Sequence, residues 1–325
     1  MRKPLRTVIG VVVVIALLGL FFGKPIVTYL AIRAAPEKTP LHSTTELART
    51  AKASFWNVFQ SNNYDSIPGV VRQLTAAYLE DPRDPEVTLL LAHAHLWRIA
   101  ESGRQKDPGP TITDDMILAE KFFEQALHLR PRDYRILGWL GSARMALGSI
   151  HQDERLTREG YFMLQESVEK FPEFNHFTIG FVMSSLLRTD RRYQDALDNM
   201  WEALDACFGK TDRRRPAPPD RALFTTQGPK RVCANSPLAP HNLEGFMLNM
   251  GDMLVKAGEP DVAKIVYANA RASETFESWP YRNLLEQRIA SADERAAVFN
   301  SLKPGDPEPE MMIHSSYGCT GCHAR

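Results

Sequence analysis

The stretch AEKFFEQALHLRPRDY, residues 119–134, decides the fold of this chain. It places Ala119, Phe123 and Ala126 at intervals of four and three residues, so they lie on one face of a helix. Pro131 then marks the end of that helix. The small residues at the outer positions allow a second helix to approach closely, and the larger residue between them fills the groove. The stretch therefore predicts the second helix of a helix–turn–helix pair.

The same spacing recurs in four further places along the chain. The corresponding triplets are Val70, Leu74 and Ala77; Gly160, Leu164 and Ser167; Ala196, Met200 and Ala203; and Ala263, Tyr267 and Ala270. The segments before them share a second set of positions: Leu91 and Ala92; Leu137, Leu140, Gly141 and Gly148; and Met247, Met250, Gly251 and Gly258. Together the two patterns resemble the tetratricopeptide repeat over roughly residues 45–275. The resemblance implies an all-α solenoid of about five helix pairs, which offers a surface to a protein partner or serves as a scaffold without a specific ligand.

The repeats are spaced unevenly, and the extra residues fall into predicted loops. We expect these loops at residues 101–113, around 149–155 and, as the longest insert, at 208–240. A last amphipathic segment, Trp279–Leu302, is expected to cap the stack. The repeat domain is therefore predicted to cover residues 45–302.

An uncharged run over residues 7–23 follows a basic flank at the N-terminus. The basic residues are Arg2, Lys3 and Arg6. As a helix the run would span about 25 Å, the short end of the membrane-spanning range. No small-x-small site follows it, so we expect an uncleaved anchor over residues 1–33 rather than a cleaved signal peptide, with a linker at 34–44. The basic flank predicts a single-pass protein of a bacterial inner membrane, with a cytoplasmic N-terminus and the bulk of the chain in the periplasm.

The composition excludes several classes of protein. The 325 residues include 39 Lys and Arg against 39 Asp and Glu, and this zero net charge argues against a nucleic-acid binder. The hydrophobic fraction of 44% is too high for a disordered chain. The sequence has no Gly-rich phosphate loop and no recognisable nucleophile triad, so we predict no hydrolase, kinase or nicotinamide enzyme.

The insert has an excess of positive charge, and the two inner cysteines lie just before it and within it. Cys207 and Cys233 form the natural disulfide pair in an extracytoplasmic compartment, with two buried free thiols as the alternative. Residues 208–232 contain seven basic residues against two acidic ones. This segment could contact anionic lipid head groups, an acidic partner or haem propionates, or it could be a solvated loop.

The candidate cofactor-binding residues lie in the segment Cys319-Thr320-Gly321-Cys322-His323, which is a C-x-x-C-H motif. Two thiols separated by two residues can add to the two vinyl groups of one porphyrin, and the histidine that follows is then held where it can ligate the iron. The motif predicts one covalent haem c on Cys319 and Cys322, with His323 as the proximal axial ligand. The resemblance to c-type cytochromes covers these five residues alone.

The sequence does not decide which residue is the second axial ligand of the haem iron. His314 lies nine residues before His323 and is a possible distal ligand of the metal, with Met311 and Met312 as alternatives. A zinc site would need four ligands and could draw on His314 in addition to the motif. A thioredoxin-like redox pair would need a βαβ setting, which the sequence does not predict, and an unused motif is the remaining alternative.

The tail, residues 303–325, begins with prolines and acidic residues. Residues 303–310 predict an extended tether of roughly 25 Å in polyproline geometry. The tail has too few apolar residues to enclose a haem by itself. The haem would therefore lie against the repeats, against a partner, or between two copies of the chain.

Two other groups of side chains could suggest metal ligands. Met247, Met250 and Met253 form a stripe, but two of them coincide with repeat packing positions, so we interpret the stripe as core. His93 and His95 are two residues apart on a predicted helix and cannot share a face. We interpret them as packing or surface residues and not as a metal pair.

The sequence thus predicts a membrane-anchored periplasmic repeat protein with one c-type haem on its tail. Its expected work is electron transfer within a redox complex, or assembly of that complex, with the partner subunit held by the repeats. The alternative is a non-redox adaptor, similar to the repeat proteins that assist cytochrome c maturation. An enzyme that uses the haem is less favoured, because no distal catalytic residue is identifiable.

Overall fold

The structure is a computed structural model that describes residues 23–36, 38–106, 112–225, 227–303, 305–313 and 319–325. The chain divides into two compact units, Met1–Thr39 and Pro40–Arg325. In the first unit residues 23–33 are helical, whereas the predicted membrane run lies outside the described residues except for Gly23. Within the described part of the chain, no helix has both the length and the apolar character to cross a membrane.

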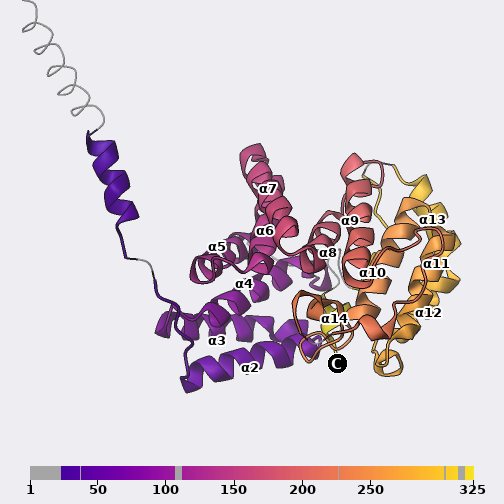
Figure 1. Cartoon of the computed structure of the whole chain (residues 1–325), viewed down its shortest axis with the longest axis horizontal. Coiled ribbons are helices and arrows are strands. Elements are labelled where there is room, and N and C mark those ends of the chain that lie inside the picture. Colours follow the sequence, from indigo (N-terminus) through magenta and orange to yellow (C-terminus); the bar gives the residue numbers. More distant parts are fainter. Residues whose placement is uncertain (1–22, 37, 107–111, 226, 304, 314–318) are drawn as a thin grey trace, which may run out of the picture. The chain divides into compact units, whose positions relative to one another are not determined.

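The second unit is all-helical over its described residues, and its helices pack in successive pairs (Figure 1). The pairs are α2 (Glu46–Gln60) with α3 (Ile67–Glu80), α4 (Pro85–Ala100) with α5 (Asp114–Leu129), α6 (Tyr134–His151) with α7 (Glu154–Lys170), α8 (Pro172–Met183) with α9 (Arg191–Phe208), and α10 (Asn242–Ala257) with α11 (Pro260–Asn269). Each pair also contacts the next, as in an α-solenoid. The short helices α12 (Arg282–Ala290) and α13 (Ala292–Ser301) follow, and α14 (Thr320–His323) lies in the tail.

The predicted second-helix positions are buried in all five pairs, which confirms the pairing pattern. Gly141 on α6 and Gly160 on α7 show why small residues are required. A Cβ atom on Gly141 would lie 2.8 Å from the carbonyl oxygen of Gly160, and one on Gly160 would lie 2.5 Å from the carbonyl oxygen of Gly141. The two backbones therefore touch, and any side chain at either position would separate α6 from α7.

Aspartates begin several of the helices. The N-cap residues are Asp84 before α4, Asp133 before α6, Asp153 before α7 and Asp190 before α9. Each side chain accepts a hydrogen bond from a backbone N–H of the first turn, which would otherwise lack a partner. These caps fix where the helices start within the repeat pattern.

Asp84 is fully buried and also pairs with Lys52, whose Nζ lies 2.9 Å from its carboxylate. Burial alone would raise the pKa of Asp84, but hydrogen bonds from Lys52 and from the backbone N–H groups of Val87 and Ser43 hold it below its usual value. A carboxyl whose pKa is lowered by folding stabilises the protein above the unfolded pKa. That stabilisation is lost as the pH falls through the folded pKa.

Asp84→Asn is therefore expected to lower the free energy of unfolding by about 2 kcal/mol at pH 7. It should also flatten the decline in stability that the wild type shows below about pH 4. Urea unfolding between pH 7 and pH 3 measures both effects. Asp153→Asn, at an exposed N-cap, is the control and should cost less than about 1 kcal/mol. Parallel pH profiles for wild type and Asp84→Asn would contradict the assignment.

The long insert is closed by the predicted disulfide. Cys207, at the end of α9, is bonded to Cys233, and their Cα atoms are 5.7 Å apart. In the chain-entropy account such a bridge stabilises the fold by about 3.5 kcal/mol, because it restricts the unfolded chain. The short 3₁₀ turns Arg221–Leu223 and Pro229–Cys233 lie between the two cysteines.

Part of the insert's positive charge is offset by the repeats themselves. Arg213 contacts Asp198 at 3.0 Å and Glu202 at 3.2 Å, both on α9. Arg221 lies 3.4 Å from Glu274. These are exposed pairs, so they contribute little stability, but they place the insert against the helices of its own chain.

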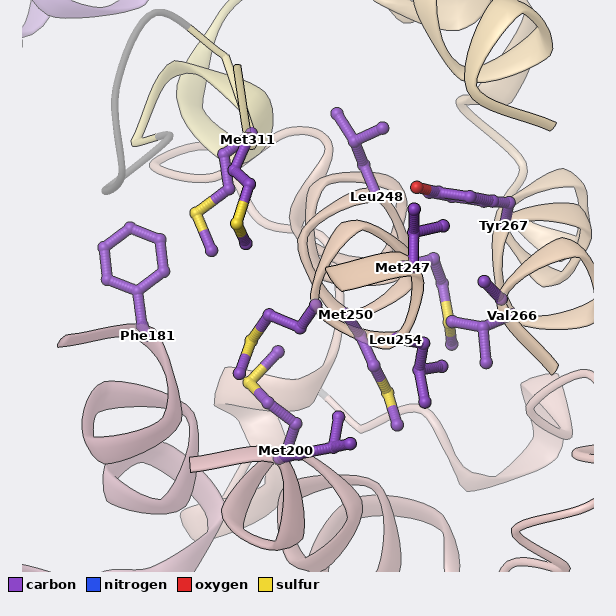
Figure 2. Packing of buried hydrophobic residues seen from close by; sticks show 14 of the residues in the cluster. Phe181, Met200, Met247, Leu248, Met250, Leu254, Val266, Tyr267 and Met311 are labelled. Carbon is purple, nitrogen blue, oxygen red and sulfur yellow. The ribbon is translucent and has the colours of Figure 1, made fainter. Parts of the chain in front are cut away.

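The methionine stripe lies in the core, as predicted. Met247, Met250 and Met253 are at most 1% exposed. Figure 2 shows methionine side chains from α10, α9 and the tail gathered around α10, among them those of Met200 and Met311. Flexible thioether side chains fill the irregular space between helices of different pairs.

The predicted capping segment is present but is divided into two helices. α12 ends at Ala290 and α13 begins at Ala292, with Ser291 between them. Leu285 and Phe299 are buried, while Val298 is 41% exposed. The segment therefore covers the core with one face only, which suits the last layer of a stack.

Candidate functional site

The motif does not project from the protein. Helix α14 packs against α10 and α2, which are the first helices of the fifth and first pairs (Figure 1). Upstream of it, Met311, Met312 and Ile313 are buried in the core. Described residues 303 and 305–310 form no helix and are mostly exposed, in agreement with the predicted extended tether. Residues 311–313 and 319–325 pack against the repeat domain of the same chain, which is one of the arrangements that the sequence left open.

One face of α10 receives the tail, and we call it the docking stripe. It consists of Gly245, Asn249, Asp252 and Lys256, which follow one another at helical spacing. Gly245 contacts Cys322, while at the other end the Lys256 Nζ lies 2.6 Å from a carboxylate oxygen of Glu308. The tail thus runs along α10 in the opposite direction to the helix.

Gly245 is the closest point of contact. A Cβ atom on this glycine would lie 2.4 Å from the Sγ atom of Cys322 and 2.6 Å from the carbonyl carbon of Gly321. The backbone N–H of His241, just before α10, donates to the carbonyl oxygen of Cys322 at 3.0 Å. Only a residue without a side chain allows α14 to lie this close to α10.

Further hydrogen bonds hold the motif from other sides. The indole N–H of Trp279 donates to the carbonyl oxygen of Gly321 at 2.9 Å. The backbone N–H of Arg325 donates to the carbonyl oxygen of Gln60 at 2.8 Å, and the Gln60 amide donates to the carbonyl oxygen of Pro237 at 2.8 Å. The end of α2, the segment before α10 and the motif are therefore joined in one network.

His323 is oriented by a backbone carbonyl. Its Nδ1 lies 2.7 Å from the carbonyl oxygen of Leu238, which can only accept, so Nδ1 carries the proton. Burial lowers the pKa of His323, and the imidazole is neutral. The Nε2 lone pair is consequently available to a metal, in the arrangement that fixes many metal-binding histidines. The ring lies 5.0 Å from that of Phe59 and 6.4 Å from that of Trp56.

The two cysteines of the motif are free and protonated. Cys322 is 6% exposed, and burial, with the nearby Glu244 carboxylate, raises the pKa of its thiol to about 12. The buried side chains form two core clusters, an N-terminal one drawn from residues 48–147 and a C-terminal one drawn from residues 164–313. Cys319 packs against both clusters, and burial together with Glu101 raises the pKa of its thiol. Both groups are thiols at neutral pH, and Cys322 is buried whereas Cys319 is only partly buried.

The two histidines of α4 point in different directions, as predicted from their spacing. His95 is a core histidine whose Nδ1 lies 2.7 Å from a carboxylate oxygen of Asp115. His93 packs edge-on against Phe123 and Trp139, with ring centroids 5.0 and 5.5 Å away. Burial, together with the electrostatic effect of His323, lowers the pKa of His93 to about 3. His323 therefore influences His93 electrostatically, a relation that no local pattern in the sequence indicates.

Asn249 was also missed by sequence reasoning. Its side chain is fully buried in the docking stripe, between the residues that meet Cys322 and Met312. Neither atom of its amide has a hydrogen-bond partner in the described part of the chain. A buried amide of this kind is costly, and it leaves a donor and an acceptor free beside the motif.

The structure describes two of the three residues predicted as candidates for the second axial ligand. His314 lies outside the described residues. Met311 and Met312 are 7% and 0% exposed and belong to the C-terminal core cluster, where they serve packing. The structure therefore gives no support to a methionine ligand.

The ligand atoms of the motif do not gather around a common point. Over the described residues, the one group of three that could hold an ion consists of His42, Asp84 and Glu86. There the Nζ of Lys52 already lies 2.9 and 3.1 Å from the two carboxylates. That group needs no metal, and the zinc alternative for Cys319, Cys322 and His323 lacks a compact set of ligands.

The donors of the motif suit a c-type haem. Two thiols and a neutral imidazole with a free Nε2 lie within one turn of helix, and the unsatisfied amide of Asn249 could bind the polar edge of a bound group. Compared with known proteins, the chain matches no protein family, no curated protein and no solved structure.

Proposed function

We propose that this protein carries one covalent haem c on Cys319 and Cys322, with His323 as proximal ligand, and transfers electrons within a redox complex or assists its assembly. The observation that carries the proposal is the orientation of His323. The Leu238 carbonyl takes the Nδ1 proton, so Nε2 is presented as a ligand one residue after the second thiol.

The two thiols of the motif are sufficient for the attachment reaction. Cys319 and Cys322 would each hold the haem by adding a thiol across one vinyl group, which forms an S–C bond and passes the thiol hydrogen to the other vinyl carbon. No atom is lost and no external oxidant is needed. The free state of Cys319 and Cys322 fits this role, whereas the disulfide between Cys207 and Cys233 keeps the other two cysteines out of the reaction.

The bound haem would supply reversible one-electron chemistry at its iron. The residues of this chain would hold it and exclude water from it. Phe59 and Trp56 cover one side of His323, and Cys319 lies where both core clusters meet. Such a packed setting restricts rearrangement of the surroundings when the charge of the iron changes.

The proposal also covers the solenoid fold and the cellular location of the protein. The paired helices and the buried small-residue triplets support a tetratricopeptide-like solenoid that holds a partner subunit. The disulfide supports an oxidising compartment, as expected for the periplasmic side of a bacterial inner membrane. The sequence of residues 1–33 supports a single-pass anchor with a cytoplasmic N-terminus.

One observation favours a second candidate function, a non-redox adaptor. The motif is already bound by its own repeats, through the close contact with Gly245 and the hydrogen bonds to Gln60 and Trp279. A repeat domain that binds a C-x-x-C-H segment of its own chain could bind the same segment of an apocytochrome. In that case the tail and the apocytochrome segment would compete for the same site on the repeat domain.

The two candidates are separated by a haem stain of the denatured protein, expressed in cells that make c-type cytochromes. We expect haem to remain attached to the wild type and to be lost in the double variant Cys319→Ala/Cys322→Ala. The matched control is Cys207→Ala/Cys233→Ala, which removes the disulfide pair and should retain the stain. Absence of covalent haem from the wild type would reject the redox function and favour the adaptor.

A further inference from the structure

The haem motif supplies one axial histidine, and the structure points to a second. The chain has nine histidines. Among those in the described helices and loops, His95, His176 and His241 each have a side-chain partner. His93 differs from them, because neither of its ring nitrogens makes a hydrogen bond to the described part of the chain, although it lies in the interior. A partly buried imidazole without a polar partner is uncommon, since most such groups are satisfied.

His93 faces the motif. Trp97 lies one turn after it on α4, so the two side chains share a face of the helix. The ring of Phe59 bridges that face to the motif, with its centroid 4.8 Å from Trp97 and 5.0 Å from His323. The ring of His93 also lies 5.5 Å from that of Trp139, which packs, as Cys319 does, against both core clusters. The two imidazoles therefore border the same region, one from α4 and the other from α14.

The ring of His93 is held in place. Phe123 and Trp139 meet it edge-on, at interplanar angles of 84° and 85°. These contacts fix the plane of the imidazole without using either nitrogen. An axial ligand needs this combination of a neutral ring, a fixed plane and a free lone pair.

We propose that His93 is the second axial ligand of the haem, on the side opposite His323. This inference rests on the proposed function, because it requires the haem that Cys319 and Cys322 would hold. It replaces His314 in the role that sequence reasoning gave to that residue. Two imidazole ligands give a low-spin iron and a lower reduction potential than a histidine and a methionine.

The test uses the haem-loaded full-length protein and the variants His93→Ala, His93→Met and His314→Ala. We expect a low-spin ferric spectrum for the wild type and for His314→Ala. His93→Ala should become high-spin while keeping its haem stain, and added imidazole should restore the low-spin spectrum. His93→Met should remain low-spin with a raised reduction potential. Circular dichroism of each variant checks that the helices are intact.

The outcomes separate this inference from the function on which it rests. A wild type without covalent haem would overturn both. A stained wild type whose spectrum survives His93→Ala but changes in His314→Ala would overturn the His93 assignment and leave the haem in place. A high-spin ferric spectrum from the wild type would show that no protein side chain is the second axial ligand. If His93→Ala fails to fold, the potential of His93→Met decides, because an unchanged potential would mean that position 93 does not reach the iron.

Discussion

Replacing Gly245 by alanine is expected to release α14 from α10. The added Cβ would lie 2.4 Å from the Sγ atom of Cys322 and 2.7 Å from its backbone nitrogen, and both distances are impossible for non-bonded atoms. The backbone nitrogen cannot move unless the whole turn of α14 moves with it. We expect the docked state to lose on the order of 3 kcal/mol, the upper range for overpacking a filled site.

The measurement is the rate at which the Cys322 thiol reacts with a thiol reagent, in a haem-free Cys319→Ser background. Because Cys322 is 6% exposed, the parent should react slowly, through transient undocking. In Gly245→Ala the rate should rise roughly a hundredfold, since about 1.4 kcal/mol corresponds to a factor of ten.

Gly69→Ala is the matched control, because Gly69 is also a helical glycine but has open space around it, with the nearest atom 3.8 Å away. It should gain up to about 1 kcal/mol from helix propensity and leave the thiol protected. Equal reaction rates in the two alanine variants would show that the tail is not docked on α10.

Asp252→Ala is expected to cost about 3–5 kcal/mol of unfolding free energy, the largest loss of stability from one substitution. Its fully buried carboxylate accepts hydrogen bonds from the Tyr267 hydroxyl at 2.5 Å and from the Met312 backbone N–H at 2.7 Å. Arg288 and Arg295 lie 3.3 and 3.6 Å from it. Alanine would leave the Tyr267 hydroxyl and the Met312 N–H without their acceptor and the two guanidinium groups without their carboxylate partner.

Urea unfolding at pH 7, with the disulfide oxidised, gives the comparison. Burial raises the pKa of Asp252 and the two arginines oppose that rise, so the carboxylate depends on its partners. Asp198→Ala is the control, because it removes an exposed carboxylate that also pairs with an arginine, Arg213. That change should cost less than about 1 kcal/mol. A similarly small loss for Asp252→Ala would mean that the buried network does not anchor the tail.

The helix pairs could be predicted from the sequence because their signal is local. Close packing of α6 on α7 requires small residues at fixed helical spacing, and Gly141 and Gly160 display that requirement directly. The disulfide was predictable for a similar reason, since Cys207 and Cys233 flank one insert. The division of the last segment at Ser291 was not predicted, because no Gly or Pro marks it.

The surroundings of the motif could not be predicted, because they depend on residues far apart in the chain. Gly245 looks like an ordinary helical glycine until Cys322 is seen against it. His93 and His95 were correctly assigned to different faces, but their partners differ for tertiary reasons. His95 meets Asp115 on the next helix, and His93 is influenced electrostatically by His323 at the opposite end of the chain. The local pattern of α4 contains neither relation.

The contact between Arg325 and Gln60 sets an order of events during synthesis. α14 docks on α2 and α10, and both precede it along the chain, so the pairs can fold as they emerge while the motif is still unmade. Once this contact has closed, the thiol of Cys322 is buried and is exposed only when the tail undocks. Docking of α14 would therefore compete with attachment of the proposed haem, because Cys322 can react only while the tail is undocked.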